Sequence, residues 1–214
     1  MPAAPDRLPT WTWWLPLPLL HLATWLSLGT QFSEGAALWH LPFALGLTMT
    51  LWWGPRVLPL LYLNSLLSIP LWGLDWRWAP LYAVPETLGV AMAWGLCRLR
   101  PVDPALPFLR HLVRFMLFGV LLALVPVAIG VQSNLWLSGH LPSHSLLSAI
   151  LTLWLADSLM TLAVAIPLLT YLTPWLQRRG WLNSPLAKRR EPVPAALRQW
   201  PAWPLLLALV LGMP

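Results

Sequence analysis

The feature that most constrains this chain is a mainly apolar run at 146–172, which carries one carboxylate near its middle. A helix needs about 20 apolar residues to cross the hydrocarbon core of a bilayer, so this run can span one with some tilt. Asp157 would lie about 16 Å along such a helix from Leu146, close to the midplane. A charge at that depth must be paired, solvated in a cavity or neutral, because an unpartnered one costs several kcal/mol. Asp157 is therefore the first candidate for a functional residue.

The composition of the whole chain is also typical of a protein embedded in a lipid bilayer. Of its 214 residues, 58% are hydrophobic and 9% are charged, whereas soluble domains carry roughly 25% charged residues. The 17 Trp and 24 Pro fit this environment, because Trp favours the membrane–water boundary and Pro is tolerated in membrane helices whose freed carbonyls find other partners. We expect an all-α integral membrane protein in contact with the lipid bilayer.

The apolar runs predict a polytopic helix bundle with six complete spans and part of a seventh. The first run is interpreted as a retained span, because the N-terminal segment has no signal-peptide cleavage pattern. The chain 1–214 is thus one membrane domain, and we expect it to be truncated before its last spans and its output module. The predicted spans lie at 11–29, 36–53, 57–73, 81–99, 115–131, 146–172 and, incomplete, 200–214.

The distribution of basic residues predicts the orientation. If the N-terminus is cytoplasmic and the spans alternate, only Arg77 of the 13 basic residues faces the other side, as the positive-inside rule requires. The net charge of +6 then reflects topology, and no nucleic-acid partner is needed to explain it. The long connection 177–199 is either an anchor beside anionic lipid or a docking surface for a cytoplasmic partner. The predicted cytoplasmic set is Arg7, Arg56, Arg98, Arg100, Arg110, Arg114, Arg178, Arg179, Lys188, Arg189, Arg190 and Arg198.

Further polar groups lie inside the predicted spans. Glu86 is expected about 7–8 Å below the outer end of its span, and His40 in the outer third of the second span. His21 and Asn64 lie near the middles of the first and third spans. If these side chains face the bundle interior, they form a polar column with Asp157 that opens outward.

Each of these residues also has a structural interpretation. His21 and Asn64 suit interhelical hydrogen bonds. His40 is either a boundary residue or a cavity residue. Glu86 follows a proline, so it either sits at a kink or is a first-turn acid of a helix that starts there. For Asp157 we favour a functional or network role, since intramembrane acids are rare and expensive.

The sequence contains no catalytic motif, phosphate loop or Cys/His metal spacing, so we expect neither an enzyme nor a bound cofactor. His140 and His144 would need to share a helical face to bind a metal, and Pro142 between them favours a loop. The spacing of Gly89 with Ala93 and of Ala91 with Gly95 indicates close helix packing. Prolines within the spans predict kinks that leave room for a cavity; they are Pro16, Pro18, Pro42, Pro59, Pro70, Pro126 and Pro167.

Three stretches share their order and spacing with a known family. GAALWHLPFALGLTMTLWWGPRVLPLLYLNSLL, YAVPETLGVAMAWGLCRL and LWLADSLMTLAVAIPLL follow one another between residues 35 and 169. Together they resemble the bacterial membrane-associated sensor domain of type one, the MASE-one family. The matching positions are Trp39, Pro42, Gly54, Arg56, Pro59, Asn64, Trp154, Asp157, Pro167, Leu168 and Leu169.

The resemblance implies a sensor. Such domains are eight-helix bundles that precede cytoplasmic histidine kinase, diguanylate cyclase or phosphodiesterase modules. We therefore expect a sensory input domain of the bacterial inner membrane, in two-component or cyclic-di-GMP signalling. Its partners would be a small ligand, an output module in the same polypeptide and a second copy of the chain. The candidate ligand-binding or signalling residues are Asp157, Glu86, His40, Asn64, Trp39 and Trp154.

Two other functions agree with the same sequence. A small permease, or the substrate-binding membrane subunit of a vitamin transporter, would use six spans and the same polar groups to bind a solute. A structural assembly protein would use the spans for packing alone. The reading frame beyond Pro214 discriminates between them, because a sensor requires an output module there.

Overall fold

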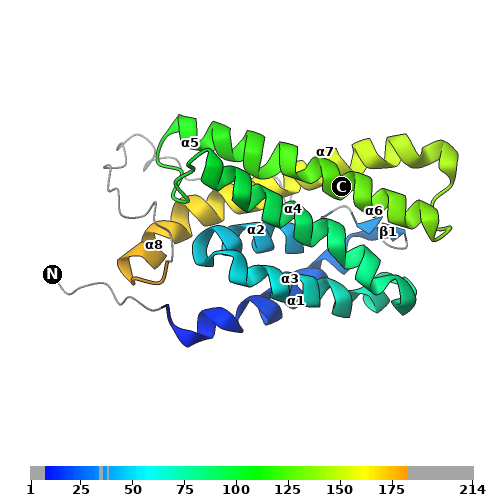
Figure 1. Cartoon of the computed structure of the whole chain (residues 1–214), viewed down its shortest axis with the longest axis horizontal. Coiled ribbons are helices and arrows are strands. Elements are labelled where there is room, and N and C mark those ends of the chain that lie inside the picture. Colours follow the sequence, from blue (N-terminus) through cyan, green and yellow to red (C-terminus); the bar gives the residue numbers. More distant parts are fainter. Residues whose placement is uncertain (1–7, 34–35, 38, 183–214) are drawn as a thin grey trace.

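Each of the six complete apolar runs coincides with a helical segment in the computed structural model, which describes residues 8–33, 36–37 and 39–182. The helices lie side by side along the long axis of the molecule (Figure 1). The predicted all-α fold is confirmed for this part of the chain, apart from one short antiparallel ribbon. The partial seventh run, 200–214, lies outside the described residues. In chain order the elements are η1 (Thr10–Trp13), α1 (Pro16–Leu28), β1 (Gln31–Ser33), β2 (Ala36–Ala37), α2 (Leu41–Trp53), η2 (Pro55–Val57), α3 (Leu58–Ser68), η3 (Ile69–Trp72), η4 (Trp76–Trp78), α4 (Ala79–Leu99), α5 (Leu109–Arg114), η5 (Phe115–Leu121), α6 (Leu122–Leu137), η6 (Ser143–Ser145), α7 (Leu146–Pro167), η7 (Leu168–Leu172) and α8 (Thr173–Arg178).

Two continuous helical stretches, Leu109–Leu137 and Ser143–Arg178, are long and apolar enough to cross a membrane. The helices Pro16–Leu28 and Leu41–Trp53 are also apolar but shorter. These lengths and compositions agree with a membrane protein. Six complete spans and a cytoplasmic N-terminus remain predictions.

The second helix begins later than predicted. The sequence predicts a span from residue 36, but Ala36–Ala37 pair with Gln31–Ser33 in the ribbon, and α2 begins at Leu41. Pro42 accounts for this start, because a proline without an N–H fits the first helical turn, where that N–H would have no intrahelical acceptor. His40 therefore lies just before α2 instead of one turn inside it.

The fifth helix is longer than predicted at both ends. The sequence predicts a span at 115–131, whereas α5, η5 and α6 form one helical stretch, Leu109–Leu137. The basic residues of α5 do not end the helix, because arginine side chains can reach toward water while their backbone stays helical. Within this stretch η5 is π-helical.

Most of the prolines start helices instead of kinking them. Four lie in the first turn of a helix: Pro16, Pro18, Pro42 and Pro59. Pro70 lies in the 3-10 segment that follows α3. Only Pro126 and Pro167 of the predicted set lie inside helices, together with Pro85. The prediction that the first group opens the bundle by kinking is wrong, since proline is compatible with a helix N-terminus.

Side-chain hydrogen bonds bring distant segments together at one end of the bundle. Trp52 Nε1 donates to Thr173 Oγ1 at 2.8 Å, and Thr173 Oγ1 donates to the Pro104 carbonyl at 3.2 Å. Arg56 donates to Thr12 Oγ1 at 2.8 Å. In Figure 1 this is the end of α5 and α8. We call it the basic end, because its segments carry Arg56, Arg98, Arg100, Arg110, Arg114, Arg178 and Arg179.

Close backbone packing joins α4 to α6. A Cβ atom added at Gly89 would lie 2.1 Å from Val127 Cγ2, and one at Gly130 would lie 2.8 Å from Pro85 Cγ. The predicted packing role of Gly89 is thus confirmed. Gly95 differs, because nothing lies within 4 Å of the position that its Cβ would take.

Candidate functional site

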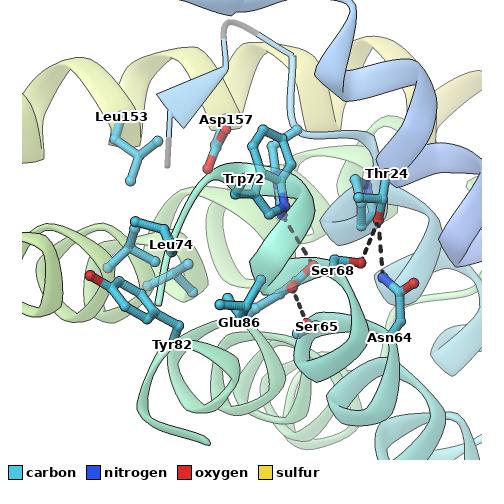
Figure 2. Close-up of a pocket in the computed structure, with 15 residues that line it drawn as sticks. Thr24, Asn64, Ser65, Ser68, Trp72, Leu74, Tyr82, Glu86, Leu153 and Asp157 are labelled. Carbon is cyan, nitrogen blue, oxygen red and sulfur yellow. Dashed lines mark hydrogen bonds and ion pairs between the residues drawn. The ribbon is translucent and has the colours of Figure 1, made fainter. Parts of the chain in front are cut away.

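A cavity of about 90 Å³ lies between the helices, and Figure 2 shows its lining. A water-sized group needs about 10–15 Å³ of such space, so the cavity has room for roughly six to nine of them. Four of the six candidate residues from the sequence line it: His40, Asn64, Glu86 and Asp157. The other lining residues are Thr24, Pro42, Ser65, Ser68, Ile69, Trp72, Leu74, Tyr82, Val127, Val131 and Leu153.

Glu86 reaches the cavity from the interior of α4. Because α4 begins at Ala79, Glu86 is not a first-turn acid, and that structural interpretation is wrong. Its side chain has two partners: Ser65 Oγ donates to Oε2 at 2.5 Å, and His40 Nε2 lies 3.2 Å from Oε1. The residue is 7% exposed. A buried carboxylate is costly without such partners, so this network holds Glu86 in place.

Asn64 belongs to a second network on the wall formed by α1 and α3. Its Nδ2 donates to Thr24 Oγ1 at 3.2 Å, and its Oδ1 lies 3.3 Å from His21 Nδ1. Ser68 Oγ donates to Thr24 Oγ1 at 3.4 Å. His21 does not line the cavity and makes the interhelical hydrogen bond that the sequence favours for it.

Asp157 reaches the cavity from α7 and differs from Glu86. It is 4% exposed, and its buried Oδ1 has no hydrogen-bond partner among the described residues. Figure 2 shows its carboxylate pointing into the space near Leu74, Leu153 and Trp72, across from Glu86. An unsatisfied buried oxygen beside empty space is a candidate for direct contact with a ligand.

No protein-family model, curated protein or solved structure matches this chain. The similarity to the MASE-one family rests on the sequence motifs alone.

The remaining two candidates, Trp39 and Trp154, do not line the cavity. The backbone N–H of Trp39 donates to Thr30 Oγ1 at 3.2 Å, which ties the segment before α2 to the end of α1. Trp154 Nε1 donates to the Leu121 carbonyl at 2.9 Å. This bond joins α7 to Leu121, the last residue of the π-helical segment η5. Both residues therefore support the fold around the site.

Trp154→Phe is expected to destabilise the protein by about 1 kcal/mol, because it removes the donor to Leu121 while keeping most of the apolar contact. Trp136→Phe is the matched control, since Trp136 on α6 is 44% exposed. Unfolding of the two variants in mild detergent, followed by circular dichroism, provides the comparison. Equal free energies of unfolding for the two variants would show that the hydrogen bond from Trp154 to Leu121 does not stabilise the protein.

The sequence did not identify four polar residues of the lining, namely Thr24, Ser65, Ser68 and Tyr82. The first three carry buried hydroxyl groups. Serine and threonine are common in membrane helices without any function, so they do not stand out. A signal was present on α3, because Asn64, Ser65 and Ser68 lie at positions that share one helical face. On α4, Tyr82 precedes Glu86 by one turn and occupies the same buried face.

The site is suited to non-covalent binding. In the parts of the chain that the structure describes, no group of three or more His, Cys, Asp or Glu side chains could hold a metal ion. His140 and His144 lie in the turn after α6 and in η6, respectively, which agrees with the predicted loop. The cavity combines two carboxylates, a histidine, an amide and hydroxyls with apolar walls, as ligand sites generally do.

Proposed function

We propose that this chain is the membrane-embedded sensory input domain of a bacterial signal-transduction protein. In this proposal it crosses the inner membrane several times, with its N-terminus in the cytoplasm, and works as a dimer. It binds a small ligand and has no catalysis of its own. It passes the signal to an output module in the same polypeptide, a histidine kinase or a module of cyclic-di-GMP metabolism.

The observation that carries the proposal is the pair of carboxylates, Glu86 and Asp157, on one cavity inside a bundle of apolar helices. A bundle that served only for packing would fill this space with apolar side chains, since buried acids are expensive in such surroundings. The two acids come from α4 and α7, so a ligand between them would contact helices that are far apart in the sequence.

The outer surface of the bundle supports a membrane location. Four leucines at four-residue spacing on α7 are each more than half exposed: Leu147, Leu151, Leu155 and Leu159. Such an apolar stripe suits lipid and is unusual on a soluble monomer. The grouping of arginines at the basic end supports the proposed orientation through the positive-inside rule.

The proposed signal path follows α7 toward the basic end. The helix carries Asp157 in its middle, contains Pro167 in its last turn, and continues as the π-helical segment η7 and then α8. π-helical turns are frequent at functional sites, and helices often kink where they occur. A ligand that favours one arrangement of α7 over another would shift the population of the two states and so bias the output.

The reading frame that contains this chain provides the first test. The proposal expects a kinase, cyclase or phosphodiesterase module after Pro214. A permease would instead show saturable uptake of a solute into proteoliposomes that contain the protein, with no output module in the frame. If the protein takes up a solute and Asp157→Asn abolishes this uptake, the sensor proposal would be wrong and the transporter would be the supported function.

A further inference from the structure

The charges around the cavity do not balance. Two acids line it, Glu86 and Asp157, and His40 is the single basic side chain among the described lining residues. His40 Nε2 already lies 3.2 Å from Glu86 Oε1, so a protonated His40 would balance Glu86 and leave the charge of Asp157 uncompensated. Buried charges in proteins are paired, because an isolated one is far more costly than a pair.

The carboxylate of Asp157 lies beside empty space in the cavity. Its Oδ1 is buried and has no hydrogen-bond partner among the described residues. Leu74, Leu153 and Trp72 lie around the space into which the carboxylate points (Figure 2). A group that fills this space would need N–H or O–H donors on one side and apolar surface on the other.

A small organic cation meets both requirements. An ammonium group provides N–H donors and a positive charge for Asp157, and its alkyl part can pack against the apolar surfaces of Leu74, Leu153 and Trp72. A metal ion fits less well, because Mg²⁺ and Ca²⁺ require six or more oxygen ligands, and Asp157 stands among leucines. An anionic ligand would add a third negative charge to the cavity.

We infer that the cavity binds a small organic ammonium ion, with its charged head on Asp157 and its apolar part against Leu74, Leu153 and Trp72. This inference rests on the proposed function, because it assigns the chemical class of the ligand that the sensor would detect. The size of the cavity limits the ligand to fewer than about ten non-hydrogen atoms.

The test compares three probes of similar size on the whole chain in lipid nanodiscs: n-butylammonium, 1-butanol and butyrate. Isothermal titration calorimetry measures their dissociation constants. n-Butylammonium is expected to bind at least 10-fold more tightly than either of the other two. Asp157→Asn is expected to weaken the binding of n-butylammonium at least 10-fold and to leave 1-butanol unchanged.

Asp75→Asn is the matched control. Asp75 is an exposed acid outside the cavity, and hydrogen bonds from Arg77 hold the pKa of its carboxyl below the usual range, so it is charged at neutral pH. This variant is expected to bind all three probes as the wild type does. If Asp157→Asn fails to fold, the selectivity of the wild type among the three probes still decides the question.

The outcomes separate this inference from the proposed function. Equal or tighter binding of butyrate or 1-butanol by the wild type would overturn the cationic ligand and leave a sensor for another ligand class. Unchanged binding of n-butylammonium by a folded Asp157→Asn variant would also overturn it. Selective binding of n-butylammonium without any change in the output of the attached module would confirm the ligand class and contradict the sensor.

Discussion

Gly89→Ala is expected to destabilise the bundle by about 1–3 kcal/mol, the usual cost of inserting a methyl group into a filled helix contact. The added Cβ would lie 2.1 Å from Val127 Cγ2 and 3.2 Å from Phe43 Cε2. Val127 cannot turn away freely, because a β-branched side chain in a helix has one strongly preferred rotamer. α4 and α6 must therefore move apart. Denaturant or thermal unfolding in mild detergent measures the loss.

Gly95→Ala provides the matched control on the same helix. No atom lies within 4 Å of the position that the added methyl group would take. The substitution is therefore expected to be neutral or to stabilise the helix by up to about 1 kcal/mol through helix propensity. A Gly89→Ala variant as stable as Gly95→Ala would show that α4 and α6 do not pack as closely as described.

Glu86→Ala is expected to destabilise the protein by about 1–3 kcal/mol, the usual cost of leaving buried hydrogen-bond donors without their acceptor. The substitution leaves the Ser65 hydroxyl and the His40 ring without their shared acceptor. A double-mutant cycle with His40→Ala isolates the contact between the two residues. Its coupling energy is expected to be about 1–3 kcal/mol, typical of side chains within one hydrogen-bond network.

Asp75→Asn controls for the loss of an acidic charge outside the cavity. It is expected to leave stability unchanged, because the pair that Asp75 forms with Arg77 is exposed to solvent and exposed pairs contribute little. Asparagine can also keep the hydrogen bond that the Arg77 backbone N–H donates to this side chain at the start of η4. Additive effects of His40→Ala and Glu86→Ala, with no coupling, would contradict the network. Chemical unfolding of the four proteins of the cycle under one set of detergent conditions supplies the free energies of unfolding.

The helices can be predicted because a long apolar run in a membrane has few other structures that satisfy its backbone hydrogen bonds. Their starts are harder to predict. The sequence predicts a kink wherever a proline lies inside an apolar run, but Pro16, Pro42 and Pro59 each lie in the first turn of a helix. Hydropathy alone cannot distinguish these cases, because the residues before the proline are as apolar as those after it.

The acids of the site are also predictable, because a charge stands out among apolar residues. Asp157 and Glu86 are identified in this way, and the structure places them on the same cavity. The partners of the acids cannot be found from sequence, since they depend on how the helices pack. Ser65 contacts Glu86 from another helix, and Trp154, which belongs to the same motif as Asp157, bonds to Leu121 instead of lining the site.

The most direct test of this account is the basal output of the sensor protein with the output module that the proposed function requires, purified in lipid nanodiscs. Kinase or cyclase activity is compared among the wild type, Asp157→Asn and the control Asp75→Asn. In the proposed mechanism, removing the acidic group of Asp157 changes the balance between two arrangements of α7, so Asp157→Asn is expected to shift the output by about 5-fold or more. Asp75→Asn is expected to match the wild type. A folded Asp157→Asn protein with the same output as the wild type would contradict the sensory role of the cavity.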